Sequence, residues 1–153
     1  VYDEYARAGS KNGVEPHIST DQFAEFHQVN IEGVLYTIHS LRSKAKRVNV
    51  IQEGSWGWIK VKGKSMNKIN GNVPINDGDY VLFQKNPNAA NNDIVVAIHK
   101  DQRSTHVKRL RKSENTLYSE TTETGLEYEP IAIEKNNMEI MGIVYAAAKP
   151  ILS

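Results

Sequence analysis

The stretch VKGKSM, residues 61–66, and the stretch HVKRL, residues 106–110, decide how this chain can be interpreted. A serine hydroxyl is a poor nucleophile until a neighbouring base removes its proton, and a lysine is a base only when its amine is neutral. Burial can supply that neutrality, because desolvation disfavours the ammonium ion and lowers the lysine pKa. The two stretches therefore predict a nucleophile, Ser65, and a general base, Lys108.

Lys108 lies in a run of β-branched and apolar residues, Thr105–Leu110, that is typical of a strand. Successive side chains of a strand point to opposite faces, so either Lys108 or Arg109 points inward. Arginine cannot be deprotonated in a protein and lysine can, so Lys108 is the residue suited to act as a base.

Ser65 follows a strand-like run, Trp58–Val61, and the intervening Gly63 permits a sharp turn. A serine at such a junction exposes its hydroxyl. The adjacent backbone N–H groups, those of Lys64 and Ser65, can then face a developing oxyanion. A Gly-x-Ser tripeptide alone carries little weight, because most such serines cap turns.

The body of the chain is predicted to be mainly β. From residue 56 onward, short β-like runs recur and are separated by turn-rich segments such as Asn76–Gly78 and Asn86–Asn88. This spacing predicts a small barrel or folded sheet. The predicted strands lie near residues 57–62, 79–84, 93–100, 104–111, 115–119, 130–134 and 138–148.

Six blocks of sequence, in order, resemble the LexA-type self-cleaving repressor peptidases over roughly residues 56–149. The blocks are Gly63–Met66, Asp77–Val81, Asp93–Ala97, Val107–Leu110, Tyr128–Ile131 and Ile140–Val144. The resemblance implies a LexA C-terminal-domain-like β fold with a catalytic dyad of Ser65 and Lys108. Two positions depart from the family pattern: Lys64 stands where Met is common, and His106 stands where Thr is frequent.

The resemblance also implies a function and partners. Members of the family cut their own linker, form homodimers and are normally attached to an N-terminal helix-turn-helix domain that binds operator DNA. Cleavage is stimulated by the RecA filament on single-stranded DNA after DNA damage. We therefore expect a cytoplasmic autoproteolytic and dimerisation domain of a LexA-type or phage-type transcriptional repressor, with no cofactor.

The family cuts a bond between small residues, usually Ala-Gly, upstream of the serine. This chain offers Ala8-Gly9 near its N-terminus, in an unpatterned polar stretch. We expect residues 1–19 to form a linker arm with the cleavage site, residues 20–50 a partly helical insertion, and residues 51–153 the peptidase and dimerisation domain. Thr20–His27 is predicted as a short helix, whereas Gly33–Arg47 fits a strand or a helix equally well.

Other functions stay open on the sequence alone. The same cleavage could activate a UmuD-like accessory factor of a translesion polymerase, and a non-catalytic dimerisation module could keep the fold. A Ser-His-Asp arrangement that uses Ser65 with His99 or His106 is a further alternative. The apolar run Ile140–Ala148 is either a dimer surface or an internal core strand.

Composition excludes several classes of protein. The 153 residues include no cysteine, which excludes disulfides and thiol catalysis, and the net charge of +1 does not argue for nucleic-acid binding by this chain. No apolar run approaches a membrane span, and no signal-peptide pattern opens the chain. The five histidines lack ligand spacing, so no metal site is predicted; they are His17, His27, His39, His99 and His106.

Three further features have structural explanations. The cations Arg42, Lys44, Lys46 and Arg47 could contact DNA or a partner, but they are more typical of a solvated face. Asp77 and Asp79 indicate a turn more than a metal or acid pair. Trp56 and Trp58 share one strand face and could line a cleft for the cleavage segment or pack as core aromatics.

Overall fold

The chain forms one antiparallel sheet of nine strands in the computed structural model, which describes residues 28–41, 56–69, 73–85 and 88–151. The strands are β1 Gln28–Ile31, β2 Val34–Ser40, β3 Trp56–Lys60, β4 Tyr80–Lys85, β5 Ile94–His99, β6 Ser104–Arg111, β7 Thr116–Tyr118, β8 Ile131–Ala132 and β9 Met138–Pro150. Two short 3-10 helices, η1 Lys112–Glu114 and η2 Leu126–Tyr128, lie among them. The predicted mainly β fold is confirmed, as an open sheet.

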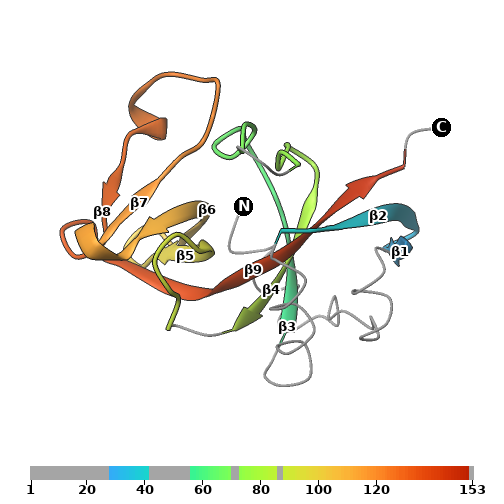
Figure 1. Cartoon of the computed structure of the whole chain (residues 1–153), viewed down its shortest axis with the longest axis horizontal. Helices are drawn as coiled ribbons and strands as arrows, with labels where there is room; N and C mark the ends of the chain where they lie inside the picture. Colours follow the sequence, from blue (N-terminus) through green and yellow to red (C-terminus); the bar gives the residue numbers. More distant parts are fainter. Residues whose placement is uncertain (1–27, 42–55, 70–72, 86–87, 152–153) are drawn as a thin grey trace.

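The long strand β9 joins the parts of the sheet (Figure 1). The main strand order is β1-β2-β9-β5-β6-β7-β8, while β3 pairs with β4 and β4 pairs with β9. The first half of β9 pairs with β5, and its second half pairs with β2. Gly142 lies where β4 and β9 meet, and a Cβ atom there would lie 2.3 Å from the Gln84 carbonyl oxygen. Only glycine fits this close approach of two strands.

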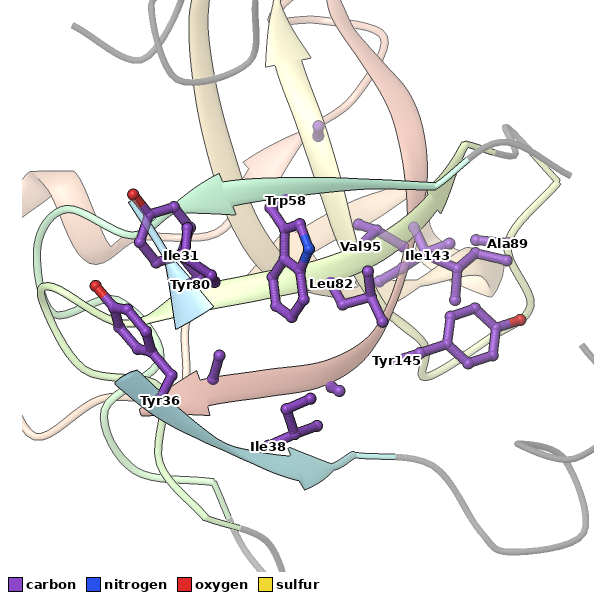
Figure 2. Close-up of a cluster of buried hydrophobic side chains, with 14 of the residues drawn as sticks. Ile31, Tyr36, Ile38, Trp58, Tyr80, Leu82, Ala89, Val95, Ile143 and Tyr145 are labelled. Carbon is purple, nitrogen blue, oxygen red and sulfur yellow. The ribbon is translucent and has the colours of Figure 1, made fainter. Parts of the chain in front are cut away.

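Apolar side chains cover both faces of the central strands, so these strands read as almost continuous hydrophobic runs. In β4, Tyr80 and Leu82 belong to a cluster that we call the aromatic cluster, and Val81 and Phe83 belong to a second one, the Met66 cluster. Figure 2 shows the aromatic cluster, in which the rings of Trp58 and Tyr80 meet edge to face with centroids 6.4 Å apart. Because successive side chains of a strand point to opposite faces, β4 contributes to both clusters.

The predicted strands from residue 56 onward match β3 to β9 closely. Within the ambiguous run Gly33–Arg47, the described part is the strand β2, and β1 was not predicted. The predicted helix Thr20–His27 lies outside the described residues, as do the cations from Arg42 to Arg47. The division into arm, insertion and body stays a prediction.

The run Ile140–Ala148 is a core strand, and its interpretation as a dimer surface is wrong for this structure. Ala146, Ala147 and Ala148 are fully buried within the chain by β2 and β4, which pair with β9 on either side. Small side chains suit this position because core residues pack against both faces of the strand.

No helix in the described ranges is long and apolar enough to cross a membrane.

Candidate functional site

The turn that carries Ser65 is fixed by hydrogen bonds to the segment before β4. The Val61 N–H donates to the Asp79 carbonyl at 2.7 Å, which extends the pairing of β3 with β4 by one step. Gly63 then takes a positive φ of 91°, a conformation that glycine adopts without strain, and its N–H donates to Asp77 Oδ1 at 2.7 Å. Asp77 is therefore a cap for the Ser65 turn, which agrees with the prediction that it has a structural role.

Ser65 itself is held from two sides. Its carbonyl accepts the Glu120 N–H at 2.8 Å, and the next residue, Met66, is 1% exposed in the Met66 cluster. Burial of a methionine side chain contributes about 1.5–3 kcal/mol, so Met66 anchors the turn. The half-buried Ser65 hydroxyl donates to the Val107 carbonyl of β6 at 3.3 Å. The hydroxyl thus lies beside the strand that carries Lys108.

Lys108 is a buried cation in the middle of β6. Its side chain is 2% exposed, and its Nζ donates to Ser119 Oγ at 2.7 Å. Burial lowers the pKa of Lys108 from 10.5 to about 8, and the negative charge of Glu127 opposes part of that shift. A lysine with this pKa is partly neutral just above neutral pH, which is the property that a general base needs.

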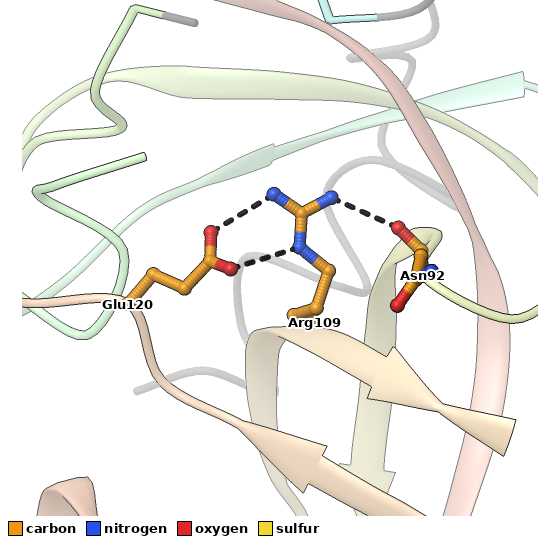
Figure 3. A network of polar contacts seen from close by, with 3 residues as sticks. All are labelled: Asn92, Arg109 and Glu120. Atoms are coloured by element: carbon orange, nitrogen blue, oxygen red, sulfur yellow. Dashed lines mark hydrogen bonds and ion pairs between the residues drawn. The ribbon is translucent and has the colours of Figure 1, made fainter. Parts of the chain in front are cut away.

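Arg109 points to the other face of β6, as strand alternation requires. Its guanidinium forms a bidentate ion pair with Glu120, at 2.9 and 3.2 Å, and donates to the Asn92 carbonyl at 2.9 Å (Figure 3). The prediction that Lys108 rather than Arg109 is the buried residue is confirmed. Since the backbone of Glu120 also bonds to Ser65, the ion pair links β6 to the serine turn.

Ser65 and Lys108 lie on adjacent elements but bond to different partners. Among the described residues, the Ser65 hydroxyl bonds to the carbonyl of Val107, which precedes Lys108, and Lys108 bonds to Ser119. No hydrogen bond joins the two side chains within that part of the chain. A role for the pair as a dyad therefore stays a proposal.

A small pocket opens next to Ser65 between the end of β3 and the start of β6. The pocket is lined by both apolar and polar residues: Ile59, Lys60, Val61, Lys62, Ser65, Thr105, His106 and Val107. The Thr105 hydroxyl is buried and has no hydrogen-bond partner in the described part of the structure. Buried polar groups normally have one, so this oxygen is an exception among the described residues.

His106 lies in the same pocket, but its chemistry differs from that of Lys108. Burial and the charge of Lys108 lower the pKa of His106 to about 4, and its Nε2 lies 3.1 Å from Ser104 Oγ. A group with so low a pKa is a weak base. His99 accepts the Gln102 N–H at its Nδ1 and is not a lining residue of the pocket.

The remaining candidates have structural roles. Trp58 is buried in the aromatic cluster and Trp56 packs against it, so core packing rather than cleft lining describes both. Asp79 is buried, pairs with Lys149 and accepts the Asn76 N–H. The described residues contain no group of three or more histidines and carboxylates placed to bind a metal ion.

Three residues of the site were not predicted from the sequence: Ser119, Glu120 and Glu127. The register of β6 with β7 pairs Arg109 with Tyr118, so one further step places Ser119 opposite Lys108. Nothing in the local sequence signals this contact, because it depends on that register. Ala8 and Gly9 lie outside the described residues. The backbone N–H groups of Lys64 and Ser65 donate no hydrogen bond within the described part of the chain.

Comparisons with known proteins place the chain in a family. The sequence model of a family described as Peptidase S24-like matches residues 27–145. Over 86 residues the chain is 37% identical to the LexA repressor of Clostridioides difficile (strain 630). The match covers 56% of this chain and 37% of that repressor, so it involves little more than a third of the relative's length.

Proposed function

Because the chain belongs to the Peptidase S24-like family, we propose that it is the autoproteolytic and dimerisation domain of a LexA-type or phage-type transcriptional repressor. In this proposal Ser65 and Lys108 form a Ser-Lys dyad that cuts the chain's own linker between Ala8 and Gly9. One observation carries the proposal: a buried lysine with a lowered pKa follows directly after the residue whose carbonyl receives the Ser65 hydroxyl.

The proposed reaction has two stages. Lys108 removes the Ser65 proton while Ser65 Oγ attacks the Ala8 carbonyl carbon, and the protonated lysine then gives that proton to the leaving amine of Gly9. The acyl-enzyme is hydrolysed by water with Lys108 again as the base. The N–H groups of Lys64 and Ser65 are proposed to bind the oxyanion, and their freedom from other described acceptors supports this role.

The pocket beside Ser65 supports the choice of a peptide segment as the substrate. Residues at and just after the end of β3 and at the start of β6 line it together with Ser65. An extended segment with small side chains fits so narrow a space, and its backbone groups can bond to the pocket's polar atoms. Ala8-Gly9 has these properties.

The wider role follows from the proposed cleavage. A homodimer of such domains would hold two helix-turn-helix domains on one operator, and two linked contacts bind far more tightly than one released domain. Cleavage stimulated by the RecA filament after DNA damage would therefore relieve repression. In this proposal repression ends because the linker between the two domains is cut, and the reaction needs no cofactor.

The rate of self-cleavage as a function of pH tests the proposal. We expect the purified chain to cut itself about tenfold faster per pH unit below pH 8 and to level off above it, because the fraction of neutral Lys108 follows that course. Mass spectrometry should identify a new N-terminus at Gly9, and Ser65→Ala should remove all cleavage. Cleavage that is already flat at pH 6 would contradict a lysine base and indicate His106 instead.

A further inference from the structure

Lys108 has one described hydrogen-bond partner, and that partner is Ser119. The Nζ to Oγ distance is 2.7 Å, and Lys108 is almost fully buried while Ser119 is half-buried. Ser119 follows directly after β7, and the pairing of Arg109 with Tyr118 places it opposite Lys108. The contact is therefore fixed by the strand register and does not depend on a flexible loop.

A neutral lysine amine has two N–H groups and one lone pair, and only the lone pair can accept the serine proton. Rotation about the Cε–Nζ bond decides where that lone pair points. An acceptor that binds one N–H group restricts this rotation, and such fixed orientation contributes to catalysis. Ser119 Oγ is the described acceptor in position to do so.

The residue after Ser119 holds the other half of the site. The Glu120 N–H donates to the Ser65 carbonyl at 2.8 Å, and the Glu120 carbonyl accepts the Lys68 N–H at 3.0 Å. The Glu120 carboxylate is held by Arg109 on the opposite face of β6. The dipeptide Ser119-Glu120 thus contacts the proposed base with its first residue and the backbone of the proposed nucleophile with its second.

Resting on the proposed function, we propose that Ser119 is a positioning residue that orients the Lys108 amine toward Ser65 by accepting one of its N–H groups. The ionisable groups around the amine are Glu127, from η2, and His106, from β6 itself. Arg109 and Glu120 neutralise each other on the opposite face. Ser119 also stabilises the ammonium form, because it accepts a hydrogen bond from it.

The test uses the full chain with Ser119→Ala, Ser119→Thr and Ser119→Val. Threonine and valine have nearly the same shape, so their difference isolates the hydroxyl. Ser113→Ala, an exposed serine of η1, is the matched control. Cleavage is measured from pH 6 to pH 10. Independently of activity, the Lys108 13Cε resonance is titrated by NMR in the Ser65→Ala background, which cannot cut itself.

Loss of the hydroxyl should lower the maximal cleavage rate about tenfold and move the Lys108 titration midpoint down by about one pH unit, because the ammonium loses its acceptor. Ser119→Thr should stay within about threefold of the parent, and Ser113→Ala should match it. An unchanged midpoint in Ser119→Val, or cleavage as fast as or faster than in the parent, would overturn the proposal. If Lys108→Arg still cuts, the proposed function fails, while the NMR titration continues to test the Ser119 contact.

Discussion

Lys108 and Ser65 are held by opposite kinds of structure. Lys108 lies in β6, which is paired on both sides, with β5 and with β7. Ser65 lies in an irregular connection between β3 and β4, which backbone hydrogen bonds, the Asp77 cap and buried side chains such as Met66 and Ile75 hold in place. A strand in the middle of a sheet can shield a cation from solvent, whereas a turn can present a hydroxyl to an incoming peptide segment.

The difference shows what each residue requires. In the proposed dyad the lysine needs burial, because desolvation lowers its pKa, and the position of Lys108 in a strand that is paired on both sides supplies that burial. The serine needs access and a fixed backbone, which the ion-paired Glu120 provides from outside. We therefore expect changes at Lys108 to alter protonation and stability, and changes around Ser65 to alter geometry alone.

The largest effect is expected for Lys108→Arg. Guanidinium stays charged at every accessible pH, so the proposed base is lost, and self-cleavage should fall by at least about 1,000-fold from pH 7 to pH 10. Gel electrophoresis and mass spectrometry over that range measure it. Lys112→Arg, at an exposed position of η1, is the control and should cut at the parental rate. Robust cleavage by Lys108→Arg would remove the lysine from the mechanism.

Replacement of Lys108 by methionine should stabilise the fold at pH 7 by about 2 kcal/mol, because the buried ammonium is costly there. The folded pKa of about 8 lies below the unfolded value of 10.5. Below pH 8 both states hold the proton and the penalty is complete. Between pH 8 and pH 10.5 only the unfolded state holds it, so the parent regains stability as pH rises.

Urea unfolding of Lys108→Met and the parent at pH 7 and pH 10 checks this expectation. The advantage of the methionine variant should be clear at pH 7 and much smaller at pH 10. A parent that is more stable than the variant at pH 7 would show that burial of Lys108 is fully compensated by its hydrogen bond to Ser119.

On the serine side, Glu120→Gln should slow cleavage about tenfold without moving the pH midpoint. The change removes the ion pair with Arg109 but keeps the backbone bond to Ser65, so the turn loosens while the Lys108 pKa stays the same. The cleavage rate at several pH values measures both quantities. Glu129→Gln, at an exposed position, is the matched control. A shifted pH midpoint of cleavage would show that the ion pair between Glu120 and Arg109 also affects the pKa of Lys108.

The smallest effect is expected for His106→Gln. His106 lines the pocket with Ser65 but is neutral at working pH, so its loss should change cleavage by less than about threefold between pH 7 and pH 9. Single-turnover rates suffice for this comparison. A fall as large as that of Lys108→Arg would identify His106 as the base.

The same contrast explains what could be predicted from the sequence. β3 to β9 are dense in β-branched residues with turns between them, so their positions follow from local pattern. The segment Gly33–Arg47 satisfies both a strand and a helix period, and pairing of its first part, β2, with β9 decides the outcome. The local pattern did not decide whether Ile140–Ala148 is a core strand or a dimer surface, because both are rich in apolar residues.

At the candidate site the buried cation was predictable from the sequence, but its contacts were not. Strand alternation limited the candidates for the buried cation to Lys108 and Arg109. Lys108 was preferred because arginine cannot be deprotonated in a protein. Ser119 and Glu120 have no such signal, because their roles depend on the register of β6 against β7. A polar residue after a short strand is otherwise typical of any loop.

The pairing of β9 has a consequence for synthesis on the ribosome. β9 is the last strand of the described residues, yet β2, β4 and β5 all pair with it. The sheet cannot close until β9 has emerged, and at about 5–20 residues per second this comes a few seconds after Lys108 has been added. Under the proposed mechanism, a hydrated Lys108 keeps its ordinary pKa of about 10.4 and stays protonated, so we expect no self-cleavage of the nascent chain before β9 has paired.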